Sequence, residues 1–256
     1  MLTGKTAIVT GSTSGIGLGI ALAMARQGAR VMLNGFGDVD GALAQVRAFD
    51  PQAVHDGADM SKPEQIEAMV RRCERELGRL DILVNNAGIQ HVALIEEFPV
   101  ERWDAIIAIN LSSAFHGMRA ALPGMKQRNW GRIINVASTH GLVASAQKSA
   151  YVAAKHGIVG LTKVAALETA LTGVTVNAIC PGWVLTPLVQ KQIDARAAAE
   201  GISDEEAKRR LLGDKQPSMQ FTTPEQLAEL ALFMCSPAAD NVRGVAWQVD
   251  GGWTAQ

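Results

Sequence analysis

The chain has 256 residues, 48% of them hydrophobic, and its 24 lysines and arginines nearly balance its 25 acidic residues. This length can fill a substantial core, and the even charge leads us to expect neither nucleic acid nor a membrane as a partner. We find no leader segment and no run of about 18 apolar residues, so we expect a cytoplasmic protein. The three widely spaced cysteines are typical of reduced core thiols, and no metal site is expected.

Short runs rich in Val and Ile alternate with amphipathic helical patterns along the chain. Such alternation implies right-handed crossovers and a doubly wound parallel sheet, here of about seven strands, covered by helices on both faces. Because no linker or repeat interrupts it, we predict a single α/β domain over residues 1–256. The expected strands begin near Lys5, Ala29, Leu80, Gly131 and Gly173, and the clearest helices span 15–28, 62–77 and 150–171.

The segment TGSTSGIG lies between the first expected strand and the first helix and carries Gly11, Gly15 and Gly17. Glycines at this turn let the backbone approach a pyrophosphate, whose charge is met by the helix N-terminus. The spacing is G-x-x-x-G-x-G rather than the more common G-x-G-x-x-G. The position of these glycines nevertheless predicts a dinucleotide site.

The end of the second strand bears on the choice of nicotinamide cofactor. Phe36 stands where an acid that binds the ribose hydroxyls would be expected, yet no Lys or Arg follows to pair with a 2′-phosphate. The missing cation favours NAD over NADP. Asp59, after the third strand, is a candidate acceptor for the adenine amino group, or alternatively a helix cap near Ser61.

The only tyrosine, Tyr151, precedes Lys155 by four residues on an expected helix, so both side chains lie on one face. Hydride leaves a carbinol carbon readily only if the hydroxyl proton is removed, and an ordinary tyrosine is too protonated to act as that base. We expect the ammonium of Lys155 to lower the pKa of Tyr151, and Ser138, at a strand end, to bond the substrate oxygen. The alternative, an amphipathic helix with a partly exposed Tyr and Lys, is disfavoured by Ser138 and Asn110.

Residues 186–221 break the strand–helix rhythm. From Leu188 to Phe221 the chain is polar and helical in propensity, and Ser203 with the acids behind it is a good helix start. Because open α/β sheets bind ligands at such strand ends, we predict a helical substrate lid. The alternative is a solvated surface hairpin.

These motifs, in their order and spacing, resemble the short-chain dehydrogenase/reductase family over essentially the whole chain. The resemblance implies a Rossmann fold, a water-linked proton relay from Asn110 to Lys155, and a second role for Lys155 in bonding the nicotinamide ribose. It also implies that the NNAG segment and the Pro181–Gly182 turn line the cofactor cleft. The motifs are TGSTSGIG, NNAG (85–88), Asn110, Ser138, Tyr151-x-x-x-Lys155 and PG (181–182). The cofactor contacts expected on this basis are Gly11, Thr13, Ser14, Gly15, Ile16, Gly17, Phe36, Asp59, Met60, Asn86, Ala87, Gly88, Tyr151, Lys155, Pro181, Gly182, Val184 and Thr186.

The loop between Ser138 and Tyr151 must line the substrate pocket, and it carries two potential cationic donors, His140 and Lys148. Such donors suit a carboxylate, and bulky indoles would keep the pocket small. The alternatives are that Lys148 points to solvent and that His140 has only a packing role. The substrate-binding set expected is Gln90, Ser138, His140, Lys148, Tyr151, Trp183, Gln192 and Trp253. This set resembles that of the bacterial 3-hydroxybutyrate dehydrogenases of the family, which implies oxidation of the D-isomer to acetoacetate with NAD by a cytoplasmic homotetramer.

Two other functions stay open from the sequence. A related reductase would act on a 3-ketoacyl thioester or a sugar or polyol, for which His140 and Lys148 would have little to do. A dinucleotide sensor without catalysis is a different class, and the intact Ser138, Tyr151 and Lys155 argue against it. The fold alone cannot decide, because it hosts many functions.

Overall fold

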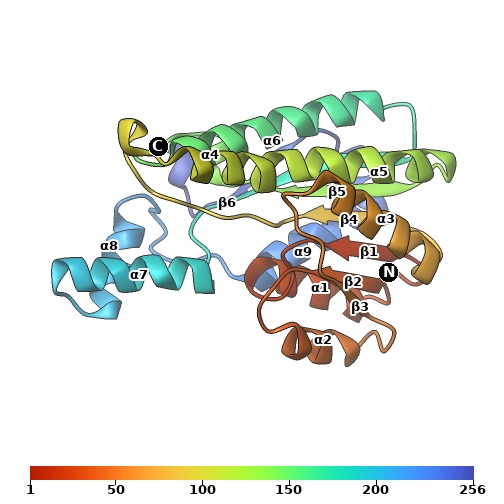
Figure 1. The fold of residues 1–256 in the computed structure, drawn as a ribbon, viewed down its shortest axis with the longest axis horizontal. Coiled ribbons are helices and arrows are strands. Elements are labelled where there is room, and N and C mark those ends of the chain that lie inside the picture. The colour runs from red at the N-terminus through yellow and green to blue at the C-terminus, as the bar shows by residue number, and fades with distance from the viewer.

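The computed structural model describes residues 1–256. At the centre of the fold is a seven-stranded parallel sheet in the order β3-β2-β1-β4-β5-β6-β7 (Figure 1). This confirms the predicted doubly wound sheet. The strand order reverses beside β1, which has β2 on one side and β4 on the other, and such a switch point opens a ligand crevice at the carboxyl ends of the strands. The strands are β1 Thr6–Val9, β2 Arg30–Asn34, β3 Val54–Asp56, β4 Ile82–Asn85, β5 Gly131–Val136, β6 Val174–Pro181 and β7 Ala246–Val249.

Helices cover both faces of the sheet, and a separate hydrophobic core lies under each layer. Successive strand residues point to opposite faces, so that Val9 belongs to one core and its neighbour Ile8 to the other. The three cysteines are buried and unpaired, as expected. One layer consists of α1 (Gly15–Arg26), α2 (Val39–Arg47) and α9 (Pro224–Cys235), and the other of α3 (Pro63–Leu77), α4 (Val100–Ile107), α5 (Ser113–Gln127) and α6 (Ser149–Glu168).

Local chemistry sets the helix ends. Helix α3 begins with Pro63, whose fixed φ and missing N–H suit a first turn, and stops at Gly78, which adopts a left-handed φ of 84°. In α9 the side chain of Thr223 accepts from the backbone of Gln226 while the Gln226 side chain accepts in return, a complete capping box.

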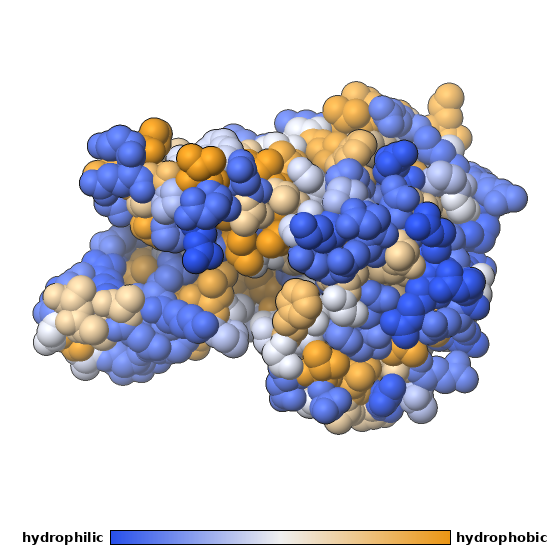
Figure 2. Space-filling view, in the orientation of Figure 1, coloured by the Kyte–Doolittle hydropathy of each residue, from blue (hydrophilic) through white to orange (hydrophobic).

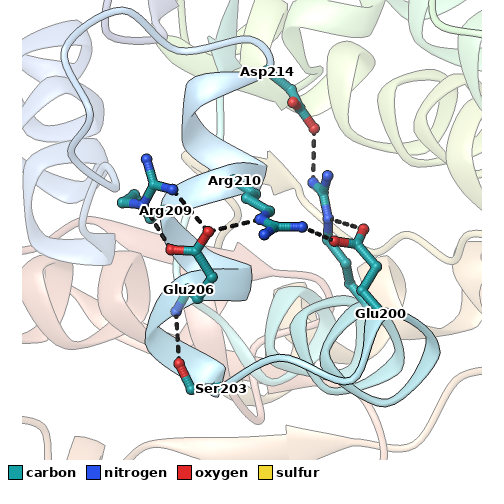
Figure 3. Close-up of polar contacts among 7 residues, drawn as sticks. Glu200, Ser203, Glu206, Arg209, Arg210 and Asp214 are labelled. Atoms are coloured by element: carbon teal, nitrogen blue, oxygen red, sulfur yellow. Dashed lines mark hydrogen bonds and ion pairs between the residues drawn. The ribbon is translucent and has the colours of Figure 1, made fainter.

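The segment 186–221 forms a helical hairpin, α7 (Pro187–Glu200) and α8 (Asp204–Gly213), that projects away from the sheet (Figure 1). Ser203 caps α8 as expected. Ion pairs join the two helices: Arg210 bonds both Glu206 and Glu200, at 2.7 and 2.8 Å (Figure 3). The hairpin also has an apolar side that packs with Trp183 and Trp253. The hairpin is therefore not surrounded by solvent on all sides. Its action as a substrate lid stays a prediction.

One feature of the second layer was not expected from the sequence. The continuous helical run Val100–Gln127 is long and apolar enough, by length and composition, to cross a membrane. Core helices of globular proteins pass the same test, and the α5 part of this run packs on α3 and on strands β4 and β5. Length and apolarity therefore do not by themselves assign it to a membrane.

Candidate active site

A cleft of about 430 Å³ runs along the carboxyl ends of the strands, between the sheet and the α7–α8 hairpin. Figure 2 shows the surface hollowed between that projecting hairpin and the body of the molecule. The cleft is lined by every residue expected to contact cofactor or substrate except Gly17, and by Ser138, Tyr151 and Lys155 of the catalytic set. Asn110 lies just outside the lining. The structure thus brings together residues that lie far apart along the chain.

The glycine loop is shaped as a phosphate site requires. Gly11 and Gly15 have φ values of +60° and +56°, which disfavour any side chain, and a Cβ on Gly17 would lie 2.4 Å from the carbonyl oxygen of Gly11. Ser14 caps α1 in an extended conformation without a side-chain hydrogen bond, so the first N–H groups of the helix stay free for an anion. The amide of Asn86 donates to the carbonyls of Thr10 and Gly11 and holds the loop in place.

The adenosine end of the cleft carries no basic side chain. The hydroxyl of Thr13 donates to the carbonyl of Phe36 at 2.6 Å, and the Phe36 ring is 68% exposed at the rim. Asp59 also lines the cleft, but its carboxylate accepts from the backbone of Ser61 at 2.8 Å, and this bond holds the pKa of Asp59 below its usual value. Lys62 rather than Asp59 is the N-cap of α3. The alternative of Asp59 as the helix cap is therefore wrong, although its carboxylate does bond Ser61, and an adenine contact stays a prediction.

Tyr151 lies in the first turn of α6 and Lys155 one turn later, with the Lys155 ammonium 5.5 Å from the centre of the tyrosine ring. That ammonium is buried and donates to the carbonyl of Val136, at the end of β5, at 2.7 Å. Ser138 lies two residues after β5 and caps a short 3₁₀ turn, its Oγ accepting from the backbone N–H of His140 at 3.2 Å. Three of the four groups of the predicted catalytic set, Ser138, Tyr151 and Lys155, therefore meet where β5 ends and α6 begins.

Burial changes the expected electrostatics of the pair. We expected Lys155 to lower the pKa of Tyr151, but burial raises the pKa of that phenol, and only the nearby Ser138 hydroxyl acts in the opposite direction. Burial also lowers the pKa of Lys155 to about 8. The expectation was wrong for the free protein, because desolvation dominates the pKa of the phenol and Lys155 is not among the groups that shift it.

Asn110 lies within a π-helical turn, Ala108–Ser112, between α4 and α5. Its side chain makes two hydrogen bonds of 2.9 Å to the backbone of Ile89, donating to the carbonyl and accepting from the N–H. These bonds hold the side chain against Ile89, and the relay from Asn110 to Lys155 stays a prediction. The π-bulge is of the kind that recurs at functional sites.

The substrate end of the cleft is a cluster of stacked rings around an ammonium. The Lys148 ammonium lies 5.0 Å from the centre of the Trp183 ring, and Trp183 and Trp253 lie 5.8 Å apart. Trp253 in turn contacts His140 edge-on at 5.3 Å. Gln192 lines the same end from α7. Lys148 therefore faces the cleft, and its alternative as a solvent-pointing lysine is wrong.

His140 is not the cation that we expected. Burial, with repulsion from Lys148, lowers its pKa to about 3, so the ring is neutral at physiological pH. Its Nε2 lies 3.0 Å from the hydroxyl of Ser145 and its Nδ1 3.4 Å from that of Ser138. His140 can thus donate or accept one hydrogen bond at each nitrogen, but the positive charge at this end comes from Lys148.

Two buried donors in the cleft have no hydrogen-bond partner in the protein: the side-chain amide of Gln90 and the indole N–H of Trp183. Native proteins rarely leave such groups unpaired, because each costs about 1–3 kcal/mol. Together with Lys148 they are suited to an oxygen-rich anion.

Comparison with known proteins agrees with this arrangement. The family model described as short chain dehydrogenase matches residues 5–197. The chain belongs to the short-chain dehydrogenase family. It is 70% identical, over all of both chains, to D-beta-hydroxybutyrate dehydrogenase of Cupriavidus necator, and 54% identical, over 98% of this chain and 99% of the relative, to the protein of the same name from Rhizobium meliloti. A variant of actinorhodin polyketide ketoreductase, solved with NADPH, superposes with a TM-score of 0.93 at 35% identity over all of both chains.

As a member of the short-chain dehydrogenase family, the chain has a Rossmann fold that binds a nicotinamide dinucleotide. Its own residues fit that group: the glycine loop leaves room for a pyrophosphate and the N-terminus of α1 is free. The methyl of Thr186 would contact a Cβ on Gly15 at 3.2 Å, which places Thr186 beside the loop. We had expected Thr186 near either the carboxamide or the pyrophosphate, and its position favours the second.

Two polar residues that act on the site were missed from the sequence. Lys215, after α8, lowers the pKa of both His140 and Lys148 by repulsion. Gln216, the next residue, accepts from the backbone N–H of Trp183 at 2.9 Å. Both lie in the polar segment that we assigned to the lid, and nothing in its composition distinguishes them from solvated residues.

Proposed function

We propose that this chain oxidises D-3-hydroxybutyrate to acetoacetate with NAD, reversibly, with Tyr151 as the general base. The observation that carries the proposal is the position of Lys148, a half-buried ammonium that faces the cleft in the same pocket as Ser138 and Tyr151. Such an arrangement suits a small acid that presents its carboxylate to the ammonium and its hydroxyl to the catalytic pair. The names of the relatives from Cupriavidus necator and Rhizobium meliloti support the same substrate.

The carboxylate clamp that we infer combines one full charge with neutral donors. Lys148 supplies the charge, and Gln90 and Trp183 supply the N–H groups that lack partners in the protein. His140, neutral, and Gln192 on α7 complete the set. An uncharged alcohol would leave these buried donors unpaired, and discrimination on this basis is steep because each unpaired group costs about 1–3 kcal/mol.

The catalytic step follows from the chain's own groups. Ser138 would hold the substrate oxygen and Tyr151 would accept the hydroxyl proton, while the bound dinucleotide would supply the acceptor for the hydride. Because burial raises the pKa of Tyr151, the phenolate depends on the hydrogen bond from the Ser138 hydroxyl. Lys155 would fix the ribose and pass the proton onward, its ammonium already held by Val136.

The preference for NAD rests on the adenosine end. A 2′-phosphate would lie near Phe36, where no Lys or Arg lines the cleft. The ketoreductase solved with NADPH and a putative 2-deoxy-D-gluconate 3-dehydrogenase solved with NADP are relatives of lower identity, 35% and 32%.

We also propose a cytoplasmic homotetramer. The outer surface of the α5–α6 layer exposes large apolar side chains, which in a monomer would remain in water. Light scattering after gel filtration tests this, and a monomer at micromolar concentration would contradict it. The residues concerned are Phe115, Val164, Leu167 and Leu171.

The decisive experiment is NADH formation from D-3-hydroxybutyrate, its L-isomer, lactate and a neutral secondary alcohol, with wild type and Tyr151→Phe. Turnover of the D-acid alone, lost in the variant although NAD still binds, is the expected result. Preference for the neutral alcohol would remove the clamp and leave a dehydrogenase. If none of these compounds is turned over, a related reductase acting on a ketoacyl thioester, a sugar or a polyol is to be tested next, and then the sensor without catalysis.

A further inference from the structure

Gln216 is a buried amide in a mostly exposed arm of the chain. It follows α8, and although its neighbours Asp214, Pro217 and Ser218 are exposed, its own side chain is only 1% exposed. Its Oε1 accepts from the N–H of Trp183 at 2.9 Å, and its Nε2 donates to the carbonyl of Gln220. Both ends of the side chain are therefore satisfied, which a fully buried amide requires.

Two glycines make room for this side chain. A Cβ on Gly182 would lie 2.5 Å from Oε1 of Gln216, and a Cβ on Gly251 would lie 2.7 Å from its Cγ. Gly182 belongs to the turn after β6 and Gly251 to the turn after β7. The Gln216 side chain thus fills the space between two backbone turns that come from neighbouring strands.

Each of these turns carries a tryptophan of the substrate pocket. Trp183 follows Gly182 directly, and Trp253 comes two residues after Gly251. The rings lie 5.8 Å apart with an interplanar angle of 34°. Trp183 contacts the Lys148 ammonium, and Trp253 contacts His140.

We propose that Gln216 is a positioning residue for the acid-binding pocket: it sets the spacing of Trp183 and Trp253 and thereby the affinity for the substrate carboxylate. Gln216 does not line the cleft, so it acts only through these residues. The inference rests on the proposed function for the identity of the substrate. The geometry of the two tryptophans can be tested without any substrate.

Other contacts hold the arm without Gln216, so a variant is expected to fold. The N–H of Ser218 donates to the carbonyl of Gly251 at 3.0 Å, and the N–H of Thr222 donates to that of Trp183 at 2.9 Å. Gln216→Met keeps the length of the side chain and removes both of its hydrogen bonds. The variant therefore loses its polar contacts to the turn after β6 and to Gln220, and keeps the apolar contact of its stem with Gly251.

The experiment compares Gln216→Met with Gln226→Met, a matched control. Gln226 is exposed, lies outside the cleft and accepts from the N–H of Thr223 in the capping box, so its variant loses a hydrogen bond and some stability without affecting the pocket. For each variant we would measure melting temperature, kcat, KM for NAD and KM for D-3-hydroxybutyrate. The spectroscopic signal of the tryptophan pair is the near-ultraviolet circular dichroism of each protein minus that of the same protein with Trp253→Phe.

We expect Gln216→Met to raise KM for the acid about tenfold, with KM for NAD and kcat changed less than about threefold, and to lose the signal of the pair. Gln226→Met is expected to lower the melting temperature and to leave KM for the acid and the signal of the tryptophan pair unchanged. A retained pair signal, or acid and NAD parameters that worsen together as stability falls, would overturn the inference. If wild type does not turn over the acid, the proposed function fails, and the pair signal alone decides the role of Gln216.

Discussion

The side chain of Asn110 and the backbone of Ile89 exchange two hydrogen bonds of 2.9 Å, across the gap between the π-helical turn and the loop after β4. Ile89 lines the cleft and immediately precedes Gln90, whose amide is buried there without a partner. The Asn110 side chain therefore acts on the substrate end of the site, whatever its backbone does in a proton relay.

Asn110→Ala is expected to lower kcat/KM for the acid about tenfold or more, because even small displacements of positioned groups are costly in catalysis. It is also expected to destabilise the fold by about 1–3 kcal/mol, since the backbone groups of Ile89 lose their partners. Steady-state kinetics and urea unfolding measure the two effects. Asn110→Asp keeps the acceptor for the Ile89 N–H and loses the donor, so an intermediate result is expected; equal activity of Asn110→Ala and wild type would contradict the assignment.

The pKa of Lys148, lowered to about 8 by burial and by Lys215, gives the acid affinity a pH dependence. Below pH 8 the side chain is an ammonium and binds the carboxylate; above pH 8 it becomes neutral, so KM for the acid is expected to rise up to about tenfold per pH unit. Lys215→Met removes a repelling charge, which raises the pKa of Lys148 and moves the rise to higher pH. The measurement is KM against pH for wild type and this variant.

Lys191→Met is the control for that experiment, because Lys191 is exposed on α7 and outside the cleft. Its KM profile is expected to match wild type. Profiles that coincide for Lys215→Met and wild type would remove Lys215 from the electrostatics of the site.

Much of the fold and the catalytic centre could be predicted because they depend on short-range rules. Parallel strands end at one edge of a sheet, and residues four apart share a helix face, so Ser138, Tyr151 and Lys155 had to meet. Of the two edge strands, β3 was expected only as a strand before Asp59, without bounds, and β7 was not located, because both are short and only partly buried and therefore lack a continuous apolar run.

What could not be predicted depends on burial and on long-range contacts. His140 was expected to be charged, and only its enclosure by rings and cations shows why it is neutral. Asn110 and Ile89 are 21 residues apart and Gln216 and Trp183 are 33 apart, and no local pattern links them. The chemical roles open to these residues could be predicted from the sequence, but the residues that they contact could not.

Gly17 tests the tightness of the phosphate loop, because a Cβ there would lie 2.4 Å from the carbonyl oxygen of Gly11 and 2.5 Å from the amide of Asn86. We expect Gly17→Ala to weaken dinucleotide binding more than about tenfold and to destabilise the fold by about 1–3 kcal/mol. Fluorescence titration with NADH measures the first effect. Gly160→Ala is the control: nothing lies within 4 Å of its Cβ, and NADH affinity there is expected to equal that of wild type. Normal affinity in Gly17→Ala would mean that the loop relaxes.

Burial of the Lys155 ammonium is expected to lower the free energy of unfolding of the protein. Its pKa falls from 10.5 in the unfolded chain to about 8 in the folded protein, because burial penalises the ammonium. Between these values the unfolded chain holds a proton that the folded protein releases, so stability rises with pH through this window, and below pH 8 the penalty is complete. At about 1.4 kcal/mol per unit, the penalty is roughly 3 kcal/mol.

Lys155→Met removes that penalty but also the hydrogen bond to Val136, which offsets about 1–2 kcal/mol. We therefore expect the variant to be inactive yet about 1 kcal/mol more stable than wild type at pH 7, with the difference vanishing or reversing by about pH 10 as the wild-type lysine loses its proton. Urea unfolding at several pH values measures this. Lys163→Met, exposed on the same helix, should show no such pH-dependent difference. A Lys155→Met protein less stable than wild type by the same amount at every pH would mean that the hydrogen bond, not desolvation, dominates at this lysine.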